Sequence, residues 1–320
     1  MRDPLVERCR AIIRDGSKSF AVAARLFDPA TRDAAYLLYA WCRHCDDAID
    51  GETLGLRDAG APADKAAQRD HLERLRAATH AALEGGEVAD PVFEALRRVV
   101  QRHAIPHVYP LELLEGFAMD VEGRRYETLH DVFAYCYHVA GVVGLMMSHV
   151  MGVHEEAARR RAADLGIALQ LTNIARDVLE DARVGRVYLP LSWLRHAGIT
   201  PEELADPRHR EALAGIVGCL LGEAELYYAS ADLGVERLRF RSAWAVAVAR
   251  GVYRDIGNVV LARGRNAWDS RCVVSPARKA FWLARGLGTA VAAVTLGRRR
   301  RHPPRRGLWT RGASLDETAF

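Results

Sequence analysis

The stretch Asn173-Ile174-Ala175-Arg176-Asp177-Val178-Leu179-Glu180-Asp181 places two aspartates four residues apart in a helix-forming run. Asp46 and Asp50 repeat that spacing in an earlier helical run. Residues at i and i+4 share one face of a helix, where two like charges cost an isolated helix roughly 0.2 to 0.5 kcal/mol. Two such pairs in one chain therefore predict a cation held between them.

Oxygen-bearing side chains extend the later pair along its helix. Gln170, Asn173, Asp177 and Asp181 follow one another at steps of three or four residues, so they form one stripe. Mg²⁺ prefers a few carboxylates together with water and phosphate oxygens. The other flank of this helix is apolar, so we expect it to be packed inside the protein. The pattern favours a magnesium-bound diphosphate over a solvated acidic face.

Apolar periodicity predicts an all-α protein. Within residues 30–49, apolar side chains repeat at the spacing of one buried helix face. Similar patterns cover residues 90–103, 110–120, 128–152, 155–182, 201–233, 238–268 and 275–296. Alternating strand patterns, internal repeats and linkers are absent. We therefore expect one helical domain over residues 1–297, followed by a basic tail over residues 298–320.

Composition is consistent with one large core. Half of the 320 residues are hydrophobic, yet no uninterrupted apolar run reaches the roughly 18 to 20 residues of a membrane span. The amino-terminal residues lack the apolar centre of a secretion signal, so a cytoplasmic location is expected. The six cysteines show no disulfide framework, and Cys42 and Cys45 lack a second ligand pair for zinc.

Five ordered stretches of the chain resemble a known family. They are Gly16–Phe20, Leu38–Asp50, Glu115–Asp120, Tyr135–Gly144 and Gln170–Pro190. The set resembles the phytoene and squalene synthases, the head-to-head prenyl synthases, and the resemblance extends to about residue 290. The Val-Tyr-Leu-Pro sequence that ends the last stretch is most similar to the bacterial phytoene-forming branch.

The resemblance implies an isoprenoid-synthase-type helical bundle with a central active-site cavity. It also implies a prenyltransferase that joins two geranylgeranyl diphosphates head to head, through prephytoene diphosphate, to 15-cis-phytoene and released diphosphate. That reaction is the first committed step of carotenoid biosynthesis. Three alternatives remain open: a squalene or dehydrosqualene synthase that uses farnesyl diphosphate, a terpene cyclase or chain elongase, and a catalytically inactive helical partner in a pigment-synthesis assembly.

The same resemblance assigns roles to individual residues. The metal ligands, for Mg²⁺ or alternatively Mn²⁺, are expected to be Asp46, Asp50, Asn173, Asp177 and Asp181. The catalytic set consists of the four aspartates among these with Arg43 and Tyr253. The substrate-binding residues are expected to be Ser17, Lys18, Ser19, Tyr39, Arg43, Tyr135, Gln170, Asn173 and Arg176. The loops at 51–64 and 182–188 adjoin the aspartates and are expected to cover the substrate.

The basic tail is a separate feature. It contains Arg298–Arg301, Arg305, Arg306 and Arg311, interrupted by two prolines. Such a segment is expected not to pack and to bind anions. No nucleic-acid-reading motif accompanies it. We expect peripheral contact with the anionic inner face of the cell membrane, at about 1 kcal/mol per basic residue near the lipid. A disordered solubilising tail is the alternative, and other carotenoid-pathway enzymes are candidate partners.

Overall fold

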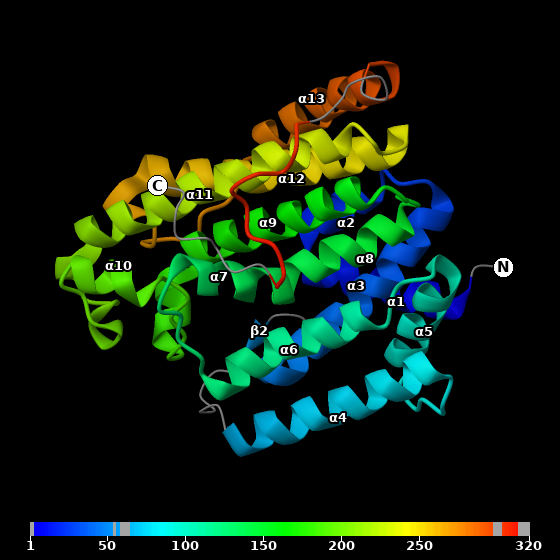
Figure 1. Ribbon diagram of the computed structural model, residues 1–320, viewed down its shortest axis with the longest axis horizontal. Coiled ribbons are helices and arrows are strands. Elements are labelled where there is room, and N and C mark those ends of the chain that lie inside the picture. The colour runs from blue at the N-terminus through cyan, green and yellow to red at the C-terminus, as the bar shows by residue number, and fades with distance from the viewer. Residues whose placement is uncertain (1–2, 54–55, 58–64, 297–302, 313–320) are drawn as a thin grey trace.

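The computed structural model describes residues 3–53, 56–57, 65–296 and 303–312, which fold into a bundle of α-helices (Figure 1). The helices are α1 (Pro4–Gly16), α2 (Lys18–Ala24), α3 (Pro29–Asp50), α4 (Lys65–Glu84), α5 (Pro91–His103), α6 (Val108–Glu122), α7 (Leu129–Cys136), α8 (Val142–Val150), α9 (Glu156–Arg183), α10 (Leu191–His196), α11 (Arg210–Val235), α12 (Phe240–Arg263) and α13 (Pro276–Thr295). The predicted all-α fold is confirmed.

The differences from the predicted elements are local. Helices α1, α2, α4 and α10 were not assigned from periodicity, and residues 201–209 form two short 3₁₀ turns, η2 (Pro201–Glu203) and η3 (Pro207–His209), before α11 begins. A two-residue antiparallel pair, β1 (Glu52–Thr53) and β2 (Leu56–Arg57), lies in the loop after α3. The rest of that loop lies outside the described residues.

Local signals fix both ends of α3. The Asp28 side chain accepts a hydrogen bond from the Thr31 backbone N–H at 3.1 Å, and Pro29 occupies the first turn, where its missing N–H costs nothing. Gly51 ends the helix with a φ of 64° and donates its N–H to the Asp47 carbonyl. The acidic run from residue 46 to residue 50 therefore occupies the carboxyl-terminal end of this helix.

Helix α9 is the centre of the bundle. It packs against α8, α11, α12 and the π-helical turn η1 (Tyr137–Gly141), which joins α7 to α8. Its apolar flank is buried, as predicted, with Ile167, Leu171, Ile174 and Val178 all at most 4% exposed. The oxygen-bearing stripe is thus held on a helix with little freedom to move.

Two glycines allow this close packing. A Cβ on Gly144 would lie 2.2 Å from the carbonyl oxygen of Ala162, and a Cβ on Gly166 would lie 2.2 Å from that of Ala140. Real Cβ atoms do not approach backbone oxygens so closely, so both positions require glycine. The two contacts bring α8 and η1 directly onto the backbone of α9.

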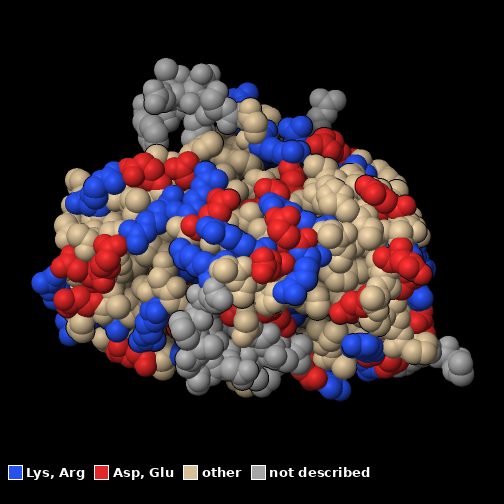
Figure 2. Space-filling view, turned by 90° about the horizontal axis from the view of Figure 1, so that it is seen from below, with Lys and Arg blue, Asp and Glu red and all other residues tan. Residues whose placement is uncertain are grey.

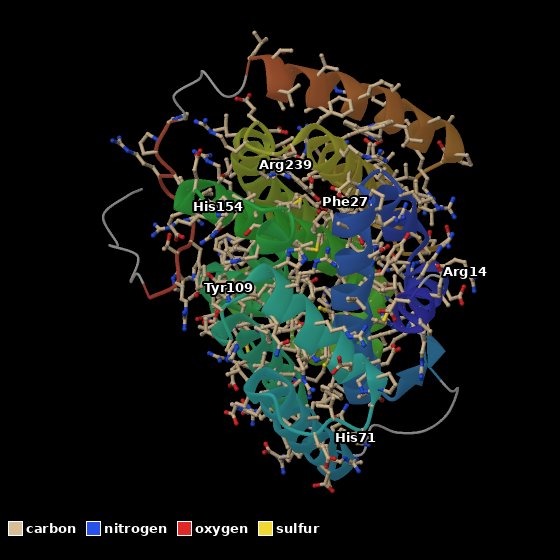
Figure 3. The ribbon with its side chains drawn as sticks, turned by 90° about the vertical axis from the view of Figure 1, so that its right-hand side faces the viewer. Arg14, Phe27, His71, Tyr109, His154 and Arg239 are labelled. Atoms are coloured by element: carbon tan, nitrogen blue, oxygen red, sulfur yellow. The ribbon has the colours of Figure 1, made fainter. Side chains whose placement is uncertain are left out.

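Helices α13 and α4 lie on opposite sides of the molecule (Figure 1). Figure 2 shows the side nearer α4, where Lys and Arg are interspersed with Asp and Glu. Figure 3 gives the same arrangement from the side, with α13 across the top and His71 of α4 near the bottom. The core lies between these two outer layers.

Two helical segments, Leu129–Val150 and Pro207–Val235, are long and apolar enough to cross a membrane by composition alone. Their most apolar windows are 56% and 44% buried inside the bundle. Core packing accounts for that composition, because both segments supply side chains to the hydrophobic core.

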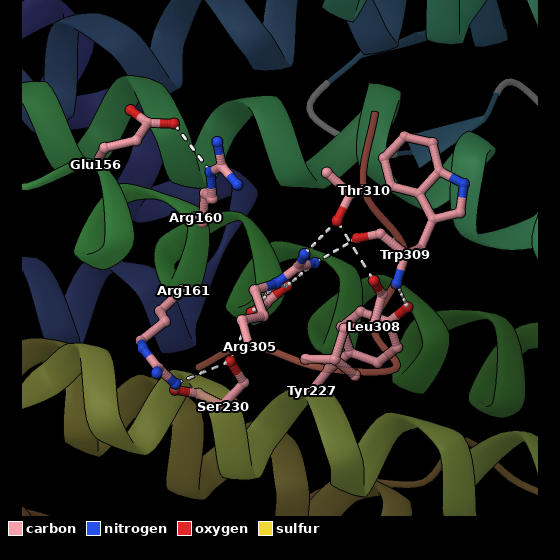
Figure 4. A network of polar contacts seen from close by, with 10 residues as sticks. Glu156, Arg160, Arg161, Tyr227, Ser230, Arg305, Leu308, Trp309 and Thr310 are labelled. Carbon is pink, nitrogen blue, oxygen red and sulfur yellow. Dashed lines mark hydrogen bonds and ion pairs between the residues drawn. The ribbon is translucent and has the colours of Figure 1, made fainter. Parts of the chain in front are cut away.

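Residues 303–312, which we name the C-terminal strap, pack against the bundle (Figure 4). The Arg305 guanidinium binds the Asp164 carboxylate with Nε to Oδ2 at 2.8 Å and Nη2 to Oδ1 at 2.6 Å. Asp164 is fully buried on α9 and also accepts the Ser230 hydroxyl at 2.6 Å. The backbone N–H of Trp309 donates to the Tyr227 hydroxyl at 3.1 Å, and Trp309 is buried.

A second ion pair fixes the far end of the strap. Arg311 lies 2.6 Å from the buried carboxylate of Glu112, which also accepts the Tyr137 hydroxyl at 3.0 Å. The prediction that residues 298–320 do not pack is therefore wrong for residues 303–312. The charge pattern predicts that these arginines bind an external anion, whereas Arg305 binds the buried Asp164 carboxylate and Arg311 binds the buried Glu112 carboxylate. Residues 297–302 and 313–320 lie outside the described part of the chain.

We expect Gly166→Ala to lower the free energy of unfolding by about 1 to 3 kcal/mol, because the added methyl group must displace the η1 backbone. Thermal and denaturant unfolding measure the change. Gly215→Ala on α11 is the matched control, since nothing lies within 4 Å of its Cβ and alanine favours a helix. Equal stability of both variants would contradict the close contact.

We expect Arg305→Met to destabilise the fold by about 3 kcal/mol, because it leaves the Asp164 charge buried and poorly compensated. Arg306→Met is the control: this neighbouring arginine is exposed, so the change should stay within about 0.5 kcal/mol. The double variant Asp164→Leu with Arg305→Met should recover much of the loss. If Arg305→Met unfolds like Arg306→Met, the strap does not pack as described.

Candidate active site

Arginines bind the aspartates at the end of α3. Arg43, one turn before the acidic run, places Nη1 3.0 Å from Asp46 Oδ2 and Nη2 2.6 Å from Asp47 Oδ1. Burial lowers the pKa of Arg43, but the two aspartates raise it more, so the net shift is upward. The guanidinium stays charged and lies on the helix face that the spacing predicted.

The stripe on α9 forms as predicted. Arg176 Nε donates to Asp177 Oδ1 at 2.7 Å, and Asn173 Nδ2 donates to Gln170 Oε1 at 3.2 Å. The Asn173 Oδ1 atom is buried without a hydrogen-bond partner. An unsatisfied buried oxygen is costly, and this one lies in a stripe of carboxylates where a cation would satisfy it.

Asp181 continues the stripe towards the carboxyl end of α9. Burial is the largest cause that raises the pKa of its carboxyl group, to about 8, and the neighbouring charge of Asp177 raises it further. Arg186 acts in the opposite direction. This carboxyl group is therefore largely protonated at neutral pH, and a cation beside it would favour its charged form.

Arg186 joins the two acidic clusters. It follows α9 in sequence, yet its guanidinium pairs with the Asp50 carboxylate at the end of α3. Burial lowers the pKa of Arg186, but Tyr188 and Asp50 raise it and prevail. The loop after α9 thus contacts the end of α3, and the same arginine lies near enough to Asp181 to lower the pKa of its carboxyl group.

A tyrosine pair closes one side of this site. The Tyr135 hydroxyl donates to Asp120 Oδ2 at 3.1 Å, and the Tyr188 hydroxyl donates to Asp120 Oδ1 at 2.8 Å. The two rings stack with centroids 4.7 Å apart. Burial raises the pKa of Asp120 to about 6, and Asp50 adds to that shift.

Further aromatic side chains lie near the charged groups, since Tyr39 interacts with Arg43 and Tyr253 interacts with Arg176. The Phe20 ring stacks on Tyr253 with centroids 5.4 Å apart and meets the Tyr39 ring edge-on at 6.4 Å. Burial raises the pKa of Tyr39 to about 12 and raises that of Tyr253. A Cβ on Gly16 would lie 2.8 Å from the Tyr39 hydroxyl, so glycine leaves room for it. These groups are neutral and apolar around the charged centre.

The first predicted segment is only partly described. Ser17 caps α2, and its Oγ accepts the Phe20 backbone N–H at 3.3 Å, so this hydroxyl has a structural role. Lys18 and Ser19 lie in α2, but their side chains fall outside the described part of the structure. Their predicted contact with diphosphate stays a prediction.

Sequence reasoning did not include Asp120 among the site residues, and it placed Arg186 and Tyr188 only in the loop over residues 182–188, which it expected to cover the substrate. Asp120 ends the Glu115–Asp120 stretch that carries the family resemblance, and Tyr188 lies in its last stretch. Their places in these two stretches were the sign in the sequence that they belong to the site. Their joint role depends on contacts between segments 15 and 68 residues apart, which spacing cannot give.

The described partners of Asp46, Asp50 and Asp177 are arginines. Within the described ranges, no group of three or more His, Cys, Asp or Glu side chains is arranged to hold a metal ion. A divalent ion would therefore require Arg43, Arg176 and Arg186 to exchange a carboxylate for the phosphate that arrives with the metal. All the ligands on offer are hard oxygen donors, which fits Mg²⁺ or Mn²⁺.

Two surface hollows lie away from these aspartates. One, of about 530 Å³, lies beside residues 85–91, and the other, of about 280 Å³, lies between α9, α11 and α12. Neither is lined by a predicted site residue. The central cavity implied by the resemblance stays a prediction.

Comparison with known proteins identifies the family. Residues 13–278 match the squalene/phytoene synthase family model. The chain is 49% identical over 308 residues to a phytoene synthase from Pseudescherichia vulneris, covering 96% of this chain and 98% of that protein. It is 48% identical over 297 residues to a 15-cis-phytoene synthase from Pantoea ananas, covering 92% and 94%.

Solved structures agree with the fold. A dehydrosqualene synthase in complex with a ligand superposes with a TM-score of 0.79 at 28% identity, covering 90% of this chain and 97% of that one. A squalene synthase from Alicyclobacillus acidocaldarius superposes with a TM-score of 0.70 at 23% identity, covering 81% and 94%, which supports the fold alone. With paired aspartate helices, a matching family model and near-full-length relatives, the chain belongs to the squalene/phytoene synthase family.

Proposed function

We propose that this chain is a 15-cis-phytoene synthase, which joins two geranylgeranyl diphosphates head to head and releases diphosphate. The observation that carries the proposal is the convergence of two acidic helix ends, those of α3 and α9, through the Arg186–Asp50 ion pair. Relatives with this name, at 48% identity over more than nine tenths of the chain, support the choice of reaction.

The proposal includes a divalent ion, Mg²⁺ in the first place. Its ligands would be Asp46, Asp50, Asn173, Asp177 and Asp181, and the unpartnered Asn173 oxygen is the observation that favours this set. When bound, the ion neutralises the departing diphosphate and so favours rupture of the allylic C–O bond. Mn²⁺ offers the same preference for oxygen ligands.

The basic residues of the site would bind and orient the diphosphates. Arg43, Arg176 and Arg186 are largely buried, so their charges act in a medium of low dielectric. Each guanidinium already forms an ion pair with at least one carboxylate. A diphosphate oxygen can replace that carboxylate without loss of the charge-assisted bond. These arginines would then hold the negative charge that develops on the leaving group.

Carbon chemistry follows from that ionisation. The donor's C–O bond breaks, and its electron pair leaves with the diphosphate. The acceptor's double bond captures the allylic cation, and proton loss closes a cyclopropane that keeps the acceptor's diphosphate. This cyclopropyl intermediate then loses its diphosphate, and the resulting cation rearranges and loses a proton to give phytoene. The aromatic groups of the site, Phe20, Tyr39, Tyr135, Tyr188 and Tyr253, would exclude water from these cations.

A second candidate is condensation of the 15-carbon farnesyl diphosphate to a 30-carbon product. The similarity to the dehydrosqualene synthase structure favours keeping it as an alternative. The two reactions use the same ionisation chemistry and differ in the length of tail that the site accepts.

Incubation of purified protein with Mg²⁺ and each diphosphate separately, followed by chromatography and mass spectrometry of the hydrocarbons, tests the proposal. We expect 40-carbon phytoene from geranylgeranyl diphosphate, with two diphosphates released per hydrocarbon. A 30-carbon product alone would establish the second candidate. An absence of diphosphate release with every substrate would instead support an inactive helical partner.

We expect Asp46→Asn and Asp177→Asn each to reduce turnover by at least about a hundredfold, because each removes a charge that faces the metal and diphosphate. The fold should persist, since each change also relieves repulsion within an aspartate pair. Both variants should lose the thermal stabilisation that Mg²⁺ with diphosphate gives the parent protein.

Asp15→Asn is the control for these variants, because Asp15 is an exposed surface aspartate that pairs with Arg14. It should leave turnover and ligand stabilisation unchanged. Full activity in either site variant would overturn the assignment of that aspartate. A loss of helical content would show a structural role instead.

A further inference from the structure

Helix α13 packs on the bundle through one face only. Its buried residues are Trp282, Gly286, Ala290 and Ala293, which share one side of the helix and face α12. The fit is close, because a Cβ on Gly286 would lie 2.7 Å from a methyl carbon of Val248. The opposite face of α13 lies at the outer edge of the molecule (Figures 1 and 3).

That opposite face, which we name the outer face of α13, is apolar. Phe281 is 45% exposed, Leu287 40%, Val291 48% and Val294 37%. Exposed Ala284 and Gly288 lie between them. With Leu296, five of the twelve exposed large hydrophobic side chains in the described residues lie within this one short segment. Scattered exposed apolar residues are ordinary, but such a concentration marks an interaction surface.

The charge around the outer face has one sign. No Asp or Glu occurs from residue 270 to residue 315, whereas exposed Arg285 lies on α13 and Arg298–Arg301 follow it in sequence. Arg278 pairs with Asp255 of α12 at 2.7 Å, so it contributes less. The side nearer α4 differs, because acidic and basic side chains are interspersed there (Figure 2).

The apolar side chains and basic residues of the outer face favour a lipid surface over a second copy of the chain as its partner. A two-fold contact between copies would bring the same basic residues of both chains together without a carboxylate from α13 to pair with them. An anionic lipid surface offers both requirements at once, acyl chains for the apolar side chains and phosphates for the basic ones. A helix with an exposed apolar face and basic neighbours suits a position parallel to the membrane plane.

We propose that the outer face of α13 docks this protein on an anionic bilayer surface. The helix lies flat on the lipid, with Phe281, Leu287, Val291 and Val294 between the headgroups, and Arg285 contacts lipid phosphates. Docking needs no transmembrane segment, because α13 keeps its inner face on α12. Delivery of a hydrocarbon product into lipid would follow, and that consequence alone rests on the proposed function.

The test is binding of the full-length protein to vesicles of phosphatidylcholine with phosphatidylglycerol, measured by co-sedimentation. We expect Leu287→Glu with Val291→Glu to weaken binding at least about tenfold, because two charges must then enter the apolar layer. The matched control is Val108→Glu with Leu226→Glu, which adds the same charge at exposed apolar positions on α6 and α11. The control should bind like the parent protein.

Two further arms separate the sources of binding. Leu287→Gln with Val291→Gln adds no charge, and a comparable loss of binding would assign the effect to apolar contact. Vesicles of phosphatidylcholine alone, or high salt, should weaken binding by the parent, since exposed charges are screened beyond about 8 Å at physiological ionic strength. Melting temperatures of all variants establish that they are folded.

Equal vesicle binding by the α13 variants and the control would overturn the proposal. So would self-association that the α13 substitutions abolish while vesicle binding persists, because the outer face would then be an interface between copies. No substrate enters these measurements, so their failure leaves the proposed reaction untouched.

Discussion

Repulsion among carboxylates at two helix ends is the constraint on which the site depends. Asp47 and Asp50 lie in the last turn of α3, and Asp181 lies in the last turn of α9. The carboxyl end of a helix already carries about half a negative charge, so these positions are unfavourable for aspartate. Arg43, Arg176 and Arg186 offset the repulsion in this structure. A cation that binds between these aspartates therefore stabilises both helix ends.

The rigidity of the bundle keeps that repulsion from being relieved by movement. Helix α9 is surrounded by α8, η1, α11 and α12, and its contacts through Gly144 and Gly166 are backbone to backbone. Side chains could rearrange, but the helix axes are fixed by close packing. The protein can therefore hold several carboxylates close together at one end of a well-packed core.

Local sequence patterns predicted most of this architecture. The limits of α3, the stripe from Gln170 to Asp181 and the buried flank of α9 follow from spacing and caps within about three turns of helix. The aspartates that are expected to bind a metal ion were chosen for the same reason. Features that need only the neighbouring turn could be predicted, because the helix period fixes which side chains share a face.

What could not be predicted depends on distant partners. Asp120 was overlooked because its two tyrosines come from α7 and from the loop after α9. The packing of the strap was missed because its carboxylate partners lie on α9 and α6. Charge runs show that a counter-ion is needed but not where it comes from. Periodicity likewise left α4 unassigned, since few of its residues are buried.

The order in which the chain is synthesised gives the C-terminal strap a further consequence. Asp164 is made 141 residues before Arg305, the arginine that neutralises it in the core. While the chain is still growing on the ribosome, α9 must carry this carboxylate without its principal partner, although amino-terminal segments generally fold first. The bundle can complete this ion pair only after Arg305 has left the ribosome. A chain that stops short of Arg305 therefore keeps the Asp164 carboxylate buried in its core without this arginine.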